Sequence, residues 1–331
     1  MGRFLLVRVL QSLATVAVAV VLIFVSIRIL PGNPALARFG QHGVPQRVQA
    51  EMAHQGWDRP IWVQLIDLPG ELLRGDLGVS FFHGEAVADR LLETIPATLE
   101  LTVAAMFLAV PLGIGAGVAS ALWRGSWPDY AAMTVALIGV SVPVFFLGIC
   151  LITIFIGMPT SGRVSPTMIS QFQTNFYLCE SLLTGKFALA MNALRHLLLP
   201  AVALGTIPAA VISRITRSSM LEVLSSDYLR TAKAKGASLW RIVWRHAMPN
   251  ASVPIVNIAG FQVGMLLSGA VLTEKVFNWP GLGRYLVTAV QEQDYAVVQG
   301  GALVIAAMFV TANLLLDLAY LWLDPRIRSE A

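Results

Sequence analysis

Residues 196–213 read HLLLPAVALGTIPAAVIS and contain no Asp, Glu, Lys or Arg. A helix needs roughly 17 to 25 apolar residues to cross the hydrocarbon core of a bilayer. A soluble core would not repeat this length six times, and the sequence therefore predicts an all-α integral membrane protein with six transmembrane helices. The five other windows without these charged residues are 9–27, 101–123, 130–162, 246–273 and 295–316.

The composition agrees with a membrane protein. Hydrophobic residues make up 56% of the 331 residues and charged residues only 13%, whereas a soluble domain carries about 25% charged residues. The two cysteines, Cys150 in the third window and Cys179 in a loop, indicate no disulfide framework. The formal net charge of +4 reflects membrane topology, and we expect no binding of nucleic acid.

The distribution of basic residues predicts the orientation, because short cytoplasmic loops are enriched in Lys and Arg. With the N-terminus in the cytoplasm, the inner segments hold 12 of the 23 basic residues and, with Asp317 at the inner end of the sixth helix, 6 of the 19 acidic residues. We therefore predict that both termini are cytoplasmic. The inner segments are then 1–8, 124–129, 214–245 and 324–331.

The spans divide the chain into four parts. The apolar run 9–27 is longer than the core of a typical secretory signal, so we expect the first helix to be retained. The expected parts are an N-terminal transmembrane helix (1–30), an extracytoplasmic segment (31–96), a five-helix core (97–323) and a cytoplasmic tail (324–331).

Proline and glycine recur inside the spans, for example Pro111, Gly113 and Gly117 in the second. Broken helices can line a water-filled path, where freed backbone groups find partners. Small residues also allow helices to approach closely, and we favour this interpretation for any single glycine.

The polar segment between the fourth and fifth spans, residues 224–249, reads LSSDYLRTAKAKGASLWRIVWRHAMP. It predicts two short amphipathic helices, broken at Gly236 and closed by Pro249. Asp227 suits the positive N-terminal end of the first helix, and glycine is the residue that most often ends one. Residue types alone support equally a docking surface for a soluble partner and an amphipathic segment lying on anionic lipid.

The same segment resembles the EAA loop of the permeases of ABC importers. The family pattern is Glu-Ala-Ala, three residues, Gly, nine residues and Ile-x-Leu-Pro. This chain has Ala232, Gly236 and Pro249 at the matching spacing, but Arg-Thr replaces Glu-Ala and His-Ala-Met replaces Ile-x-Leu. The segment DYLRTAKAKG resembles the corresponding segment of the dipeptide, oligopeptide and nickel subfamily. Other segments that resemble this subfamily are RILPGNPA, GDLGVS, TIPATLELTV, SGRVSP, SLLTGKFALAMNALRHLLLPAVALG, EKVFNWPGLGRYL, DYAVVQG and LDPRIR.

The resemblance implies the type I ABC importer permease architecture in a multi-pass protein of the bacterial inner membrane. It implies a second homologous permease, identical or not, and two ATP-binding subunits or one fused ATPase. An extracytoplasmic binding protein would deliver the solute, which the sequence leaves open as a dipeptide, a longer peptide, a nickel chelate or glutathione. The helix that ends at Gly236 would be the coupling helix. The residues expected to contact the ATPase are Asp227, Arg230, Ala232, Gly236 and Arg241.

No phosphate-binding loop of the form G-x-x-x-x-G-K-[ST] occurs in the sequence. We therefore expect no catalytic residue, no metal site and no bound cofactor in this chain, and ATP with Mg in the partner ATPase.

Two other classes of membrane protein are alternatives to this interpretation. An ion-coupled secondary transporter is the alternative, but such proteins place ionisable residues inside the membrane, and the central windows have none. An intramembrane enzyme is a third class, and the five histidines form no H-E-x-x-H pair.

Two residues beyond the fifth span, Glu274 and Trp279, are candidates for an outer vestibule or gate. The simpler interpretation of Glu274 is an interfacial ion pair with Lys275, which would have a small effect.

Overall fold

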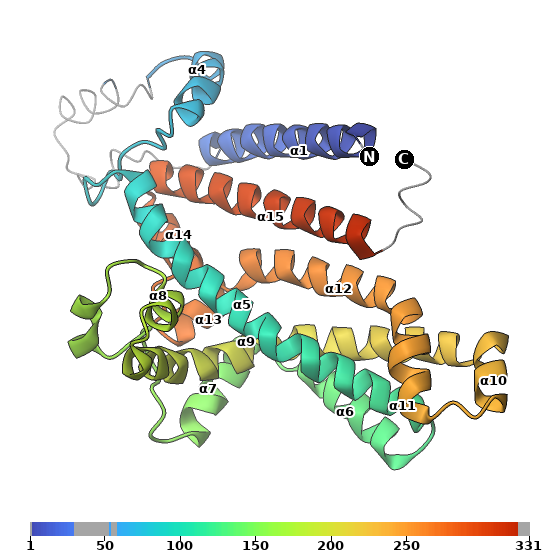
Figure 1. The fold of residues 1–331 in the computed structure, drawn as a ribbon. Coiled ribbons are helices and arrows are strands. Elements are labelled where there is room, and N and C mark those ends of the chain that lie inside the picture. Colours follow the sequence, from blue (N-terminus) through green and yellow to red (C-terminus); the bar gives the residue numbers. More distant parts are fainter. Residues whose placement is uncertain (1, 30–52, 54–57, 324–331) are drawn as a thin grey trace.

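The computed structural model describes residues 2–29, 53 and 58–323. Within these ranges every regular element is a helix (Figure 1). Five helical stretches are long and apolar enough to cross a membrane, and a bent helix pair is a sixth. The prediction of an all-α membrane protein is therefore confirmed. The long helices are α1 (Gly2–Ile29), α5 (Val87–Leu122), α9 (Phe187–Leu224), α12 (Met248–Gly269) and α15 (Tyr295–Leu323).

The third predicted span is not a straight helix. It forms α6 (Trp127–Ser141) and α7 (Val144–Ile154), which are bent by 106° at the break between them. Pro143 lies in this break, and proline disfavours the helical conformation at the preceding residue; Val142 accordingly has an extended backbone. At 15 residues, α6 is about 22 Å long, which is shorter than the roughly 30 Å hydrocarbon core. The window thus forms a broken span or a re-entrant pair.

The centre of the bundle is the packing of α5 against α9 and α12. At Gly117 of α5, a Cβ atom would lie 2.5 Å from the carbonyl oxygen of Ser213 in α9. At Gly205 of α9, it would lie 2.8 Å from the carbonyl oxygen of Ala105. Both helices also run unbroken through their prolines. The interpretation as a position of close helix packing is therefore confirmed for Gly117 and Gly205.

At the edge of the bundle α1 lies along α15 (Figure 1). Arg8 pairs with Asp317 at 3.3 Å near one end of the two helices. Near the other end, Arg28 donates hydrogen bonds to Gln299 of α15 (3.0 Å) and to Gln64 (2.8 Å) of α4 (Ile61–Leu73). The helix α4 is not apparent in the sequence pattern.

The short elements gather at two ends of the bundle (Figure 1). The α10 end holds α10 (Asp227–Ala234), α11 (Leu239–Arg241), the π-helical turn η2 (Ile242–Ala247) and the α5–α6 connection, together with the start of α1 and the end of α15. The α14 end holds α4, α8 (Tyr177–Leu183), α13 (Val271–Val276) and α14 (Leu282–Glu292). A 3-10 helix, η1 (Pro166–Gln171), precedes α8.

This grouping matches the predicted division of segments between two sides of a membrane, although α14 itself was not predicted. Both cysteines are free thiols. The predicted tail 324–331 lies outside the described residues.

Candidate functional site

The helix α10 ends at Gly236 as the sequence predicts. The Gly236 amide donates to the carbonyl oxygen of Lys233 (2.9 Å), and the Ala237 amide donates to that of Ala232 (3.2 Å). This pair of bonds is the Schellman motif, which needs a left-handed residue after the helix. Gly236 supplies it with φ +77°, and no atom lies within 4 Å of where its Cβ would be. The turn is therefore open to a partner.

The second predicted helix begins after Ser238, but the prediction that Pro249 closes it is wrong. The segments α11, η2 and α12 follow one another without a break, so the polar segment enters the fifth span directly. Pro249 therefore lies inside a continuous helical stretch, where it has no amide hydrogen to donate to the preceding turn. The wider π-helical turn before it adds a residue and moves the preceding carbonyl groups away from the proline ring.

The buried face of this region is formed by aliphatic side chains. Leu229 of α10 is 2% exposed and packs in the core that contains Ile242 and Val243. The two tryptophans, Trp240 and Trp244, are instead 73% and 43% exposed, and their ring centroids lie 5.4 Å apart. The apolar anchor of α10 is therefore aliphatic, and the tryptophan pair is available to lipid or to a partner.

Hydrogen bonds join α10 to the start of the fifth span. The Tyr228 hydroxyl donates to the carbonyl oxygen of His246 (3.3 Å). The Asn250 side-chain amide donates to the Tyr228 hydroxyl (2.9 Å) and to the same His246 carbonyl (2.8 Å). Because Asn250 lies in α12, these bonds tie α10 to a membrane-spanning helix.

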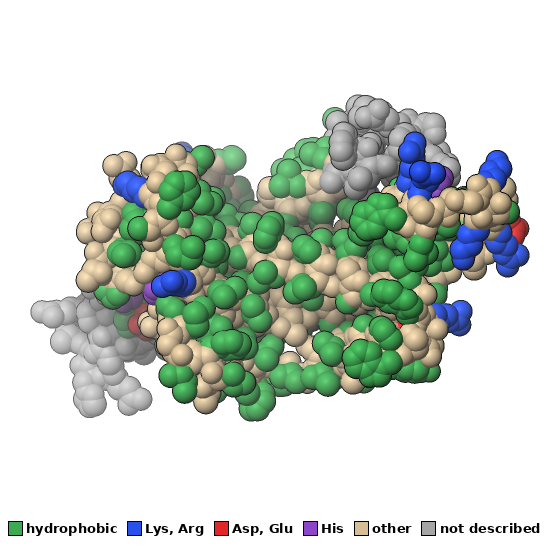
Figure 2. Space-filling view, turned by 60° about the horizontal axis from the view of Figure 1, so that its bottom comes forward, with side chains coloured by type: hydrophobic (Ala, Val, Ile, Leu, Met, Phe, Trp, Pro, Cys, Tyr) green, Lys and Arg blue, Asp and Glu red, His purple; other side chains and the backbone are tan. Residues whose placement is uncertain are grey.

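The exposed surface of the α10 end is basic. Asp227 pairs with Arg230 at 3.3 Å, and both side chains are largely exposed, so the pair itself adds little stability. Figure 2 shows Lys and Arg side chains gathered at this end of the molecule. Of the five predicted contact residues, Ala232 is half-buried and the other four are exposed. Further exposed basic residues without a carboxylate within 4.0 Å in the described part of the chain are Lys233, Lys235, Arg241 and Arg245.

A buried ion pair holds the α5–α6 connection at the same end. Asp129 accepts hydrogen bonds from Arg217 of α9 through Nε (2.8 Å) and Nη2 (2.9 Å), and from the Gly125 amide (2.9 Å). The Ser120 hydroxyl of α5 also donates to Asp129. The bidentate geometry is the strong form of this contact, and it fixes the connection against α9.

The predicted gate residues lie at the α14 end, and both are buried. Glu274 is 0% exposed and accepts hydrogen bonds from the Thr98 hydroxyl (2.6 Å) and from the Arg284 amide (2.8 Å). The carboxyl group therefore caps the N-terminal end of α14 by accepting the Arg284 amide. In the described part of the chain Lys275 forms no ion pair with Glu274, and Glu274 is buried; the interpretation as an exposed interfacial ion pair is therefore wrong.

The second of these residues, Trp279, is 1% exposed and donates its indole Nε1–H to the carbonyl oxygen of Ala97 (2.9 Å). This bond ties the α13–α14 connection to α5. A role of Glu274 and Trp279 in gating stays a prediction.

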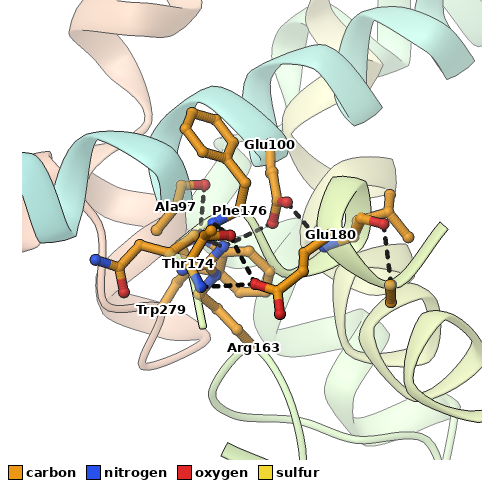
Figure 3. A network of polar contacts seen from close by, with 10 residues as sticks. Ala97, Glu100, Arg163, Thr174, Phe176, Glu180 and Trp279 are labelled. Atoms are coloured by element: carbon orange, nitrogen blue, oxygen red, sulfur yellow. Dashed lines mark hydrogen bonds and ion pairs between the residues drawn. The ribbon is translucent and has the colours of Figure 1, made fainter. Parts of the chain in front are cut away.

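Sequence reasoning missed an ion pair beside Trp279 (Figure 3). Arg163 Nη2 donates to Glu100 Oε2 (2.7 Å) and to the carbonyl oxygen of Asn175 (2.6 Å). The two charged side chains are only 4% and 7% exposed. The Arg163 guanidinium carbon lies 4.0 Å from the centre of the Tyr177 ring and 5.9 Å from that of Trp279. Arg163 thus joins the α7–α9 loop to α5 and to the α13–α14 connection.

A second carboxylate, Glu180, organises the same loop (Figure 3). It accepts hydrogen bonds from the amides of Gln173 (2.8 Å) and Thr174 (2.7 Å) and from the Thr174 hydroxyl (2.7 Å). These bonds, the one from the Thr174 hydroxyl first, lower the pKa of Glu180. Among the described residues, no group of three His, Cys, Asp or Glu side chains could hold a metal ion.

The Glu274 network gives a stability prediction. Glu274→Ala leaves the Thr98 hydroxyl and the amides of Gly283 and Arg284 without their acceptor. Buried donors without partners are costly, so we expect the free energy of unfolding to fall by about 1–3 kcal/mol. The measurement is the thermal midpoint of the purified protein in detergent. Glu274→Gln, which keeps an acceptor, should lose less, and equal losses in the two variants would contradict the capping role.

The same residue gives a pH dependence. Burial raises the pKa of Glu274, and the hydrogen bonds from Thr98, Arg284 and Gly283 only partly oppose it. The native state then holds the Glu274 proton more tightly than the unfolded state does. The contribution of this proton to the free energy of unfolding is therefore complete below the ordinary pKa and is lost as the pH rises through the raised pKa. We expect Glu274→Gln to gain stability relative to the wild type over that pH range, and a difference that is constant with pH would exclude the titration.

Comparison with known proteins assigns the chain to a family. Residues 109–329 match the family described as the binding-protein-dependent transport system inner membrane component. Residues 1–102 match the N-terminal region of such membrane components. The chain belongs to this family. It is a multi-pass membrane permease with the type I ABC importer permease fold, and the resemblance inferred from the EAA-like loop is confirmed.

Its relatives include named permeases of peptide transport systems. The chain is 45% identical to the di/tripeptide transport system permease protein DppB of Pseudomonas aeruginosa, over 93% of this chain and 94% of that protein. It is 43% identical to the dipeptide transport system permease protein DppB of Escherichia coli K12, over the full length of both. It is 36% identical, again over the full length of both, to the glutathione transport system permease protein GsiC of Escherichia coli O6:H1.

Proposed function

We propose that this chain is a transmembrane permease subunit of an ATP-driven peptide importer, in which it forms the translocation path together with a second homologous permease. Membership of the binding-protein-dependent transport family supports the class of transporter. The relatives named as di/tripeptide and dipeptide permeases support peptides as the substrate. On this proposal the α10 end faces the cytoplasm, and the α14 end receives peptide from an extracytoplasmic binding protein.

The observation that carries the proposal is the structure of α10 and its hydrogen bonds to the fifth span. A short helix ends in an open glycine turn and carries exposed basic residues. Its inner side is fixed to the fifth span through Tyr228 and Asn250. A partner that moves α10 would therefore move α12. We propose that this partner is an ATPase subunit whose docking cleft is acidic, because complementary charge steers and orients association.

ATP hydrolysis, on this proposal, belongs to two ATP-binding subunits or one fused ATPase. ATP and Mg bind there and not to this chain, whose sequence has no phosphate-binding loop of the Walker type. Among the predicted contact residues, Arg230 and Arg241 supply charge, whereas Ala232 and Gly236 keep the helix end small. The lipid bilayer is the remaining partner, facing the many exposed apolar side chains of the long helices.

Reconstituted transport tests this function. The permease pair, the ATPase and the binding protein are placed in liposomes, and uptake of labelled dipeptide is measured with ATP or with an ion gradient as the only energy source. We expect uptake only when both ATP and the binding protein are present, and no uptake when the ion gradient is the energy source. Uptake driven by the ion gradient without ATP would show the alternative, a secondary transporter.

A charge reversal on α10 sharpens this test. Arg230→Glu places a negative charge against the acidic cleft that we propose. Close charge contacts of this kind change binding affinity by about tenfold or more, and we expect ATP-driven uptake to fall by about tenfold or more. The control is Arg124→Glu, which reverses an exposed basic residue in the α5–α6 connection at the same end. Equal uptake by Arg230→Glu and the wild type would remove Arg230 from the docking surface.

A further inference from the structure

An open pocket lies at the α14 end, between the first turns of α5 and the start of α14. Its volume is about 550 Å³, within the range of about 300–1,000 Å³ typical of small-molecule sites. Arg90 and Thr94 line it from α5, and Arg284 and Tyr285 line it from α14. The pocket is therefore built from two elements that the Glu274 network holds in place.

The cation of this pocket that lacks an acidic partner is Arg284. Its Nη1 donates to the carbonyl oxygen of Asn278 (3.2 Å), and no carboxylate of the described residues lies within 4.0 Å of its guanidinium. The Glu274 carboxylate is nearby in the chain but is already bound by the Thr98 hydroxyl and by the Arg284 backbone amide. The Arg284 side chain thus retains donors for an anionic group.

The other charged side chains of the pocket that could meet an anion already contact carboxylates. Arg90 pairs with Glu93 (2.6 Å) and with Glu85 (3.7 Å), and His83 lies 3.4 Å from Glu292. This leaves Arg284 as the position where an incoming negative charge is favoured.

The pocket wall also holds an unused hydrogen-bonding group. The Tyr285 hydroxyl is buried and has no hydrogen-bond partner in the described part of the protein. Unpartnered buried polar groups are rare in folded proteins and call for an explanation. The hydroxyl is buried, so it lies beneath the wall of the pocket and is not exposed to a ligand in it.

We propose that this pocket binds a carboxylate group, with Arg284 as the cation that holds it. A guanidinium matches a carboxylate in a planar, two-pronged geometry. The inference rests on the proposed function for the source of the carboxylate: either the C-terminus of a peptide entering the path or an acidic side chain of the binding protein docked above it. The chemistry at Arg284 is the same for both sources.

The test uses the assembled importer in lipid nanodiscs without the binding protein, with dialanine as the probe and dialanine amide as the analogue that lacks the carboxylate. We expect dialanine to bind, dialanine amide to bind about tenfold or more weakly, and Arg284→Gln to weaken dialanine binding by a similar factor. Arg284→Lys keeps the charge without the planar fork and should fall between. Arg59→Gln is the control, since Arg59 is an exposed basic residue at the same end, paired with Asp67 at 3.6 Å.

A second arm measures the affinity of the binding protein for the same nanodiscs. One outcome is that dialanine does not bind, while the affinity of the binding protein falls for the Arg284→Gln importer and not for the Arg59→Gln control. This outcome would support the pocket and assign the carboxylate to the binding protein. Unchanged dialanine binding and unchanged binding-protein affinity in Arg284→Gln would overturn the proposal. Dialanine binding that needs Arg284, in an importer without ATP-driven uptake, would support the pocket while overturning the proposed function.

Discussion

Gly236→Pro is expected to abolish ATP-driven uptake while the protein still inserts into the membrane. Proline holds φ near −65°, whereas Gly236 has φ +77°, so the substitution cannot preserve the turn that ends α10. Proline also lacks the amide hydrogen that Gly236 donates to Lys233. The open end of α10 would unwind or turn away. We expect uptake in reconstituted liposomes to fall to background with normal amounts of protein in the membrane.

The chain contains a matched control for this substitution at the opposite end. The helix α8 ends in the same motif: the Gly185 amide donates to the Leu182 carbonyl (3.3 Å), and the Lys186 amide donates to the Ser181 carbonyl (2.9 Å). Gly185 has φ +69°. Gly185→Pro therefore causes the same local strain without touching α10. We expect it to retain the ATPase subunit, and loss of the ATPase from both variants would mean that general misfolding explains the effect.

Arg163→Met is expected to be the most destabilising single substitution at the α14 end. It leaves the Glu100 carboxylate buried without its cation, and breaking one side of a buried ion pair costs about 3–5 kcal/mol. It also removes the contact of the guanidinium with the Tyr177 ring. The thermal midpoint in detergent should fall clearly, and hydrogen exchange should rise in the loop between α7 and α9.

The control for this prediction is the double variant Arg163→Met with Glu100→Gln. A neutral amide can still accept the hydrogen bond from the Leu178 amide (2.8 Å in the native protein), so the double variant avoids a buried unpaired charge. It should recover part of the lost stability. A single variant that melts like the wild type would show that the pair is not stabilising.

The sequence was sufficient to predict the membrane spans and the end of α10, because both depend on local properties. Charge-free windows predict spans by their length alone, and a glycine after a helix predicts its own left-handed conformation. The same local rule failed at Pro249, where the π-helical turn accommodates the proline. It was incomplete at Pro143, which divides the third window into two helices bent by 106°.

The candidate sites were less predictable, because they depend on contacts between distant residues. Glu100 and Arg163 are 63 positions apart, and nothing in the sequence around either residue specifies the other. Glu274 looks like an exposed neighbour of Lys275 until the fold places Thr98 beside it. The pocket at Arg284 requires α5 and α14 to meet. A charged residue next to an apolar window, as at Glu100, was the only available signal.

Affinity purification of the tagged chain from its native membranes in mild detergent, with mass spectrometry of the proteins that accompany it, tests most directly whether α10 docks an ATPase. We expect an ATP-binding protein to accompany the wild type, Arg124→Glu and Gly185→Pro, and to be lost from Arg230→Glu and Gly236→Pro. A wild-type chain that purifies without an ATPase, and still moves peptide in ATP-free liposomes under an ion gradient, would contradict the proposed coupling.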